Sequence, residues 1–160
     1  FRGRHYTLRS AIAEPKPAQR PLPLLIAGKG RTAIRLAARH AALWNAICLP
    51  TQLAHHVAAL RSELSATGRA STDVIATVSF RLIIRDDRAG LRSRVRQLDR
   101  EWREDEYRIQ GSADEVVQAL SRYIDAGAAG LIVQMPAPFD FVTLERLAAQ
   151  RTTLARVVTA

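Results

Sequence analysis

The run Leu24-Leu25-Ile26-Ala27-Gly28-Lys29-Gly30-Arg31 decides the fold expected for this chain. It begins with four apolar residues, as in a short strand buried on both faces of a parallel sheet. Gly28 and Gly30 end that strand, and from Arg31 to Ala41 apolar residues recur at helical spacing with no glycine or proline between them. We therefore predict a strand, a glycine turn and a helix.

The same alternation continues along the chain. Apolar runs or period-two alternation predict further strands at 43–49, 74–84 and 130–135. Helical spacing predicts helices near 53–64, 91–102 (on Leu91, Val95, Leu98 and Trp102), 116–124 and 140–148. Two helix starts carry capping signals, the pair Ser112 and Glu115, and Asp140. The expected fold class is α/β, with about four βα units and parallel strands. An eight-stranded TIM barrel and an open doubly wound sheet share this pattern, which leaves both possible.

Length and composition bound the architecture to one domain. The 160 residues, 48% of them hydrophobic, suffice for one core. We expect a single partial-barrel domain over 1–160, with an irregular lead-in at 1–23, βα units at 24–150 and a tail at 151–160. The chain opens at Phe1 without an initiator Met, so we expect a fragment of a longer protein. Its apolar runs are too short for a membrane helix, and we expect a soluble protein.

The net charge of +9 indicates an anionic partner, and the distribution of the charges limits which class of anion that partner can be. Lys16 and Lys29 are the only lysines, and the arginines are scattered without a run of like charge. We therefore expect neither nucleic acid nor a membrane as partner. Cys48 is the only cysteine, which excludes internal disulfides and fits a reducing cytoplasm. Its apolar neighbours predict a buried, unreactive thiol.

Other chemistry-bearing residues are given structural interpretations. His55 and His56 are adjacent on a predicted helix, so we expect them not to face one ligand, and no metal site is expected. One acidic pair, Asp86-Asp87, and one acidic triplet, Glu104-Asp105-Glu106, lie in a charged stretch and are expected to be solvated.

Several segments, taken in order and spacing, resemble the luciferase-like monooxygenase family. They are FRGRHY at 1–6, PKPAQRPLP at 15–23, IAGKG at 26–30, LAARHAALWN at 36–45, GSADEV at 111–116 and AGAAG at 126–130. Two positions depart from the family pattern. Ala27 replaces the first residue of a glycine pair, which still permits close backbone approach, and Ala42 replaces an aspartate, which removes a carboxylate.

The resemblance implies an eight-stranded barrel that binds FMN or coenzyme F420 and transfers hydride or activates oxygen at the flavin ring. This chain would be the C-terminal half of that (β/α)8 TIM barrel. The pattern is closest to the F420-dependent branch. Because the family's first four strands have no counterpart here, no catalytic residue is carried over.

The glycine turn is the candidate phosphate site on physical grounds too. A buried strand that ends where a helix begins directs unpaired amides at whatever lies above the strand. Glycines would let a phosphate approach the backbone, and the flanking cations would pair with its oxygens. Turns of this kind also occur for packing alone. The predicted cofactor-binding residues are Ala27, Gly28, Lys29, Gly30, Arg31 and Asn45.

The functions left open differ in class. The first is an oxidoreductase portion whose partners are a phosphorylated flavin-type cofactor and a small-molecule substrate. The alternative is a non-catalytic half-barrel module that self-associates as a homo-oligomer, or a truncated product, because a half-barrel leaves strand edges unpaired near 24–27 and 130–135. Trp44 is either a core residue or part of the cofactor lining.

Overall fold

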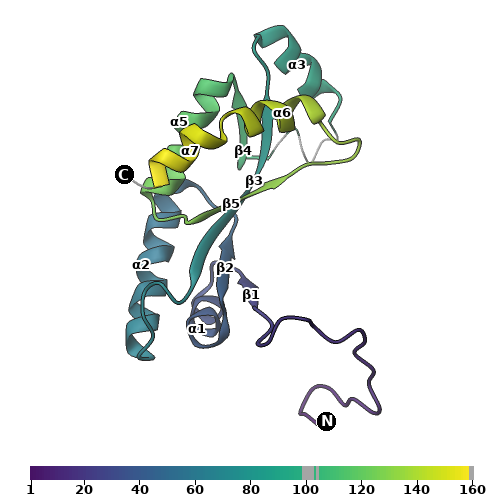
Figure 1. The fold of residues 1–160 in the computed structure, drawn as a ribbon, viewed down its shortest axis with the longest axis vertical. Coiled ribbons are helices and arrows are strands. Elements are labelled where there is room, and N and C mark those ends of the chain that lie inside the picture. Colours follow the sequence, from purple (N-terminus) through teal and green to yellow (C-terminus); the bar gives the residue numbers. More distant parts are fainter. Residues whose placement is uncertain (99–102, 104, 159–160) are drawn as a thin grey trace.

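The chain forms one parallel sheet with helices between its strands (Figure 1). The structure, a computed structural model, describes residues 1–98, 103 and 105–158. The strands are β1 (Leu25–Ala27), β2 (Leu43–Ala46), β3 (Ile75–Ile84), β4 (Arg108–Gly111) and β5 (Gly130–Gln134). The helices are α1 (Arg31–His40), α2 (Pro50–Ala66), α3 (Arg88–Arg96), α5 (Ala113–Asp125), α6 (Phe141–Ala149) and α7 (Arg151–Val158).

The long strand β3 organises the sheet. It pairs in parallel with β2 at 75–78, with β5 at 77–81 and with β4 at 81–84, and β1 pairs in parallel with β2. Since β2 and β5 share partners on β3, they lie on opposite edges of it, and β4 continues the edge that β2 begins. Among the described strands, β1, β4 and β5 therefore each pair with one strand only, as expected for an unclosed sheet.

One face of the sheet carries the core. Along β3, the alternate residues Ala76, Val78, Phe80, Leu82 and Ile84 pack with buried side chains of α1, α2 and α5. The other face is open at several positions, because Leu25 is 46% exposed, Ile75 47% and Ile132 38%. The buried side chains supply the usual hydrophobic stabilisation, whereas the open face leaves apolar surface in water.

The sequence-based elements are largely confirmed. Strands at 25–27, 43–46, 75–84 and 130–134 and the parallel α/β class match the expectation. The second strand ends at Ala46 rather than at Leu49, because Leu49 is already the N-cap of α2 and Pro50 its first residue. Ser112 and Asp140 cap their helices as predicted.

Three differences from the expectation bear on the site. The charged segment holds a strand, β4, that its composition concealed, and α3 ends at Arg96 among the described residues. Trp102, the last residue of the predicted stripe, lies outside the described residues. Residues 151–158 of the expected tail form α7. The lead-in is irregular as predicted and extends away from the sheet (Figure 1).

Candidate functional site

The turn after β1 is held from below by the next strand. The indole Nε1 of Trp44 donates a hydrogen bond of 2.9 Å to the carbonyl oxygen of Gly28. The amide of Gly28 donates to the carbonyl of Asn45 at 3.0 Å. This corrects one expectation: the ladder between the two strands continues one residue past β1, so the Gly28 amide is not available to an anion. Trp44 is fully buried and acts as a core residue that fixes the turn.

The two glycines of the turn differ in what they do. Gly28 has φ of +137°, and a Cβ there would lie 2.9 Å from the Cβ of Ala33. The fold itself therefore requires a glycine at this position. Gly30 has φ of −72°, and a Cβ there would meet nothing within 4 Å. Packing and backbone conformation give no reason for Gly30, so the open space above it is available to a ligand.

The first turn of α1 presents positive charge. Gly30 is the N-cap and, in the part of the chain that the structure describes, no side chain caps the helix and no acidic residue lies in its first turn. Lys29 precedes the helix and Arg31 begins it, although cations are disfavoured at this end of a helix dipole. Neither forms an ion pair within the described residues, and the Lys29 ammonium lies 5.4 Å from the centroid of the Tyr107 ring.

A cleft of about 340 Å³ opens between α1 and α2 beside this turn. Its polar lining comes from both helices and the turn, with Lys29, Arg31, His55, His56, Ser62 and Glu63. The two histidines, expected to diverge, border the same cleft with ring centroids 5.9 Å apart. Adjacent helical residues are separated by about 100° of rotation, which is small enough for a groove along the helix to reach both.

Burial and like charge tune the groups around the cleft. Burial lowers the pKa of His56, and the charges of His55 and Lys29 lower it further. The ring of His56 also meets the edge of Trp44, with centroids 6.3 Å apart. Burial raises the pKa of the Cys48 thiol despite the opposing charge of Lys29. Cys48 is 1% exposed, which confirms the expected buried thiol.

The side chain of Asn45 lies on the open face of the sheet. Its Oδ1 is 3.0 Å from Thr77 Oγ1 and 3.1 Å from Ser79 Oγ. Ala27 pairs with Asn45 and Asn45 with Thr77, so these residues form one row across the sheet. The predicted site residues therefore divide into a charged turn beside the cleft and a polar row on the sheet. A ligand that touches both must cross the carboxyl ends of β1 and β2.

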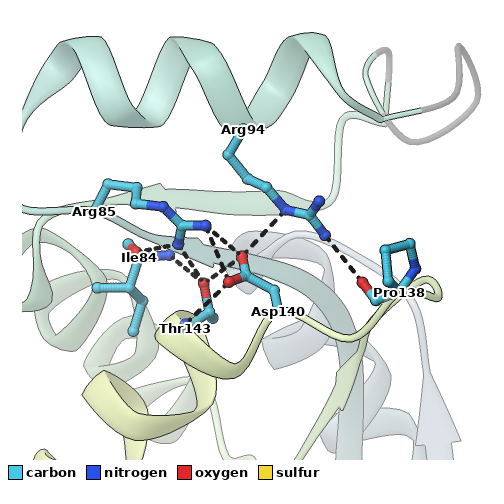
Figure 2. Close-up of polar contacts among 6 residues, drawn as sticks. All are labelled: Ile84, Arg85, Arg94, Pro138, Asp140 and Thr143. Atoms are coloured by element: carbon cyan, nitrogen blue, oxygen red, sulfur yellow. Dashed lines mark hydrogen bonds and ion pairs between the residues drawn. The ribbon is translucent and has the colours of Figure 1, made fainter.

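A second polar cluster lies beyond the carboxyl end of β3 (Figure 2). Both carboxylate oxygens of Asp140 accept hydrogen bonds of 3.0 Å from the guanidinium of Arg85, and Arg94 Nε lies 3.3 Å from Oδ2. The hydroxyl of Thr143 donates to the same carboxylate at 2.9 Å. Burial by itself raises the pKa of Asp140, but hydrogen bonds from Arg85 and Thr143 outweigh it and lower that pKa below 3.8.

The acidic clusters are only partly the solvated groups that were expected. Asp86 is exposed and pairs with Arg146, and Asp87 caps α3. Asp105, by contrast, forms an ion pair of 3.2 Å with Arg81, and its side chain is 13% exposed. It is drawn inward because β4, which follows it, pairs with β3. Glu104 lies outside the described residues.

Some residues of these clusters were missed by sequence reasoning. Tyr107 and the ion-pairing Asp105 depend on β4, whose four residues alternate too briefly to be distinguished inside a charged segment. Arg85 follows a strand directly, where parallel sheets place functional side chains, and that position was the available signal. Among the described residues, no group of three or more His, Cys, Asp or Glu side chains is arranged to hold a metal ion. Nor is any helix in those residues long and apolar enough to cross a membrane.

The family of the chain is shown by a comparison with family models. A family model described as luciferase-like monooxygenase matches residues 1–140. No curated protein matches the sequence.

Solved structures of similar fold include one enzyme named for coenzyme F420 and two named as monooxygenases. The coenzyme F420-dependent tetrahydromethanopterin reductase from Methanopyrus kandleri matches with a TM-score of 0.62 and 14% identity over 79% of this chain and 49% of its own. EDTA monooxygenase from Chelativorans sp. BNC1 matches with a TM-score of 0.67 and 18% identity over 99% of this chain and 49% of its own. Long-chain alkane monooxygenase LadA matches with a TM-score of 0.70 and 13% identity over 96% of this chain and 46% of its own. The chain spans about half the length of each, and its open sheet corresponds to part of their TIM-barrel fold.

Proposed function

Because the chain belongs to the luciferase-like monooxygenase family, we propose that it is the phosphate-binding part of an oxidoreductase that uses FMN or coenzyme F420. The solved structures of similar fold include a reductase named for coenzyme F420 and a riboflavin lyase that holds a modified FMN, so both cofactors stay open. The proposal assigns the cofactor phosphate to the turn of Lys29, Gly30 and Arg31.

The observation that carries the proposal is the first turn of α1. It has no capping side chain within the described residues, it is flanked by two cations without ion pairs, and its N-cap glycine faces open space. Uncapped helix amides and cations that form no ion pair within the described residues suit a phosphate, which supplies several acceptor oxygens and negative charge. The residues present therefore fit the phosphate of either cofactor.

Each part of the site has a separate task in this proposal. Lys29 and Arg31 bind phosphate oxygens, and Gly30 leaves room for them. Gly28 and Trp44 hold the turn in shape. A bound flavin or deazaflavin would supply the redox chemistry. Asn45, with Thr77 and Ser79, offers polar contacts across the sheet to the remainder of the cofactor, since binding sites of parallel α/β folds lie at the carboxyl ends of the strands.

The test is titration of the chain with FMN and, separately, with riboflavin, which lacks the phosphate. Both are followed by flavin fluorescence, and coenzyme F420 is titrated in parallel. We expect FMN or F420 to bind, riboflavin to bind at least tenfold more weakly than FMN, and Lys29→Gln to weaken the phosphorylated ligands selectively. Lys16→Gln, in the exposed lead-in, is the matched control. Equal affinity for FMN and riboflavin, or no binding of either FMN or F420, contradicts the proposal.

The open sheet face favours a second candidate, a module that associates with a second copy. Leu25, Ile75 and Ile132 are exposed on three strands of that face, and within the described residues β1 and β5 each present an unpaired edge. Sedimentation of the chain over a range of concentrations tests this. A dimer that Ile132→Lys dissociates supports it, whereas a monomer at all concentrations removes it.

A further inference from the structure

The cleft beside the glycine turn holds more ionisable groups than the turn itself requires. Lys29 and Arg31 approach it from the turn and α1, while His55 and His56 approach from α2. His55 is exposed and His56 is half-buried. Within the described residues, neither imidazole is engaged in a hydrogen bond; the two rings contact each other, and His56 also contacts Trp44.

These groups repel one another when the cleft is empty of anions. The pKa of His56 is lowered by burial first and then by His55 and Lys29, so the unliganded protein favours the neutral imidazole. Glu63, farther along α2, is the carboxylate that lines the cleft. Cys48, near Lys29, contributes no charge because burial raises the pKa of its thiol. Protonation of the imidazoles beside Lys29 and Arg31 therefore costs free energy unless an anion joins them.

We propose that His55 and His56 form a proton-dependent clamp, in which the protonated imidazoles hold a phosphate from the side of α2 while Lys29 and Arg31 hold it from the side of α1. The inference rests on the proposed function for the identity of the ligand, a phosphorylated cofactor, and on the cleft for the existence of the clamp.

The clamp ties binding to pH with a definite sign. A phosphate in the cleft favours the charged imidazole and so raises the pKa of each histidine that it contacts. By reciprocity, protonation strengthens phosphate binding, and affinity falls as pH rises through the range in which the imidazoles lose their protons. The second ionisation of a phosphate, near pH 6, acts in the opposite direction, so comparison with a variant that lacks both imidazoles isolates the histidine contribution.

The first measurement needs no flavin. The histidine ring protons of the chain are titrated by NMR between pH 5 and 9, with and without inorganic phosphate, and assigned with His55→Gln and His56→Gln. We expect phosphate to raise the pKa of His55, His56 or both, and to leave His40, at the far end of α1, unchanged. Equal shifts at all histidines, or no shift at His55 and His56, overturns the clamp.

The second measurement separates the clamp from the proposed function. FMN affinity is measured at pH 6.5 and 8 for the chain, for the double variant His55→Gln with His56→Gln, and for the control His40→Gln. We expect the loss of affinity with rising pH to be about 3- to 10-fold larger in the chain and the control than in the double variant. FMN binding with the same pH profile in all three overturns the clamp and leaves the proposed function standing. Absence of binding of both FMN and coenzyme F420, with phosphate-dependent histidine shifts, contradicts the proposed function alone.

Discussion

Arg31 is a residue at which local stability and the proposed binding oppose each other. It begins α1, whose first turn lacks an acidic residue, and the helix dipole disfavours a cation there. A side chain chosen only for helix stability would be acidic. A bound anion would offset this unfavourable interaction between the Arg31 charge and the helix dipole.

We expect Arg31→Glu to raise the free energy of unfolding of the unliganded chain by about 0.3–1 kcal/mol, because it reverses an unfavourable charge–dipole interaction. The same substitution should abolish the difference in affinity between FMN and riboflavin. Chemical denaturation and flavin titration measure the two effects. Arg35→Glu, one turn later on the exposed face of α1, is the control and should change both much less. Loss of stability in Arg31→Glu would contradict this account.

Asp140 is the residue on which the second cluster depends. Its side chain is 6% exposed and its carboxylate is shared by Arg85 and Arg94. Because its pKa is lowered in the folded chain, its contribution to stability is complete above the ordinary pKa of 3.8 and is lost as pH falls through the folded value. Removing the charge would leave two guanidinium groups without their carboxylate.

Asp140→Asn should therefore lower the free energy of unfolding at pH 7 by about 3 kcal/mol, as removal of one partner of a buried ion pair does. The gap between the variant and the parent should narrow as pH falls below 4. Denaturant titrations at pH 7, 5 and 3 measure it. Asp86→Asn, which breaks an exposed pair with Arg146, is the matched control and should cost little. A pH-independent gap would show that the charge of Asp140 is not the cause.

The turn that joins β1 to α1 shows that two glycines close together in a sequence can have different structural roles. Gly28 and Gly30 look equivalent as letters. The structure gives the first a positive φ and a close neighbour, and gives the second ordinary backbone and open space. Only the first is required by the fold.

Gly28→Ala should lower the free energy of unfolding by about 1–3 kcal/mol, because alanine is strained at that φ and its Cβ would press on Ala33. Gly30→Ala should change stability by less than about 1 kcal/mol, because alanine restricts the unfolded chain without strain but is a poorer N-cap than glycine. Thermal unfolding of the two variants side by side checks the contrast. Equal losses would mean that the turn is shaped differently.

At the same scale, the sequence predicts elements that have a strong local pattern and misses those that depend on distant partners. The capping box of Ser112 and Glu115 places α5, and the alternation in β3 predicts its ten-residue length closely. β4 could not be read, because its pairing with residues 81–84 of β3 decides its conformation. The meeting of His56 with Lys29 likewise arises from the packing of α1 on α2, which no spacing within either helix reveals.

At the scale of the whole molecule, a ligand that binds only the folded chain must raise its stability. We expect FMN at one hundred times its dissociation constant to raise the free energy of unfolding by about 2.7 kcal/mol. Riboflavin at the same concentration, with at least tenfold weaker binding, should raise it by about 1.4 kcal/mol or less. Thermal scans with each ligand measure this. A chain already stabilised by association of two copies would instead melt at a temperature that depends on protein concentration, with no response to FMN.

The contact between Trp44 and His56 gives the molecule a built-in optical signal. The indole is sealed in the core, bonded to the glycine turn and edge-on to an imidazole whose protonation the clamp controls. A positively charged imidazole quenches indole emission. Filling the cleft should therefore lower the fluorescence of Trp44 at a pH at which His56 is neutral in the empty protein. Ligand binding in the cleft thus changes the fluorescence of a buried indole, and occupancy of the cleft can be followed without a label.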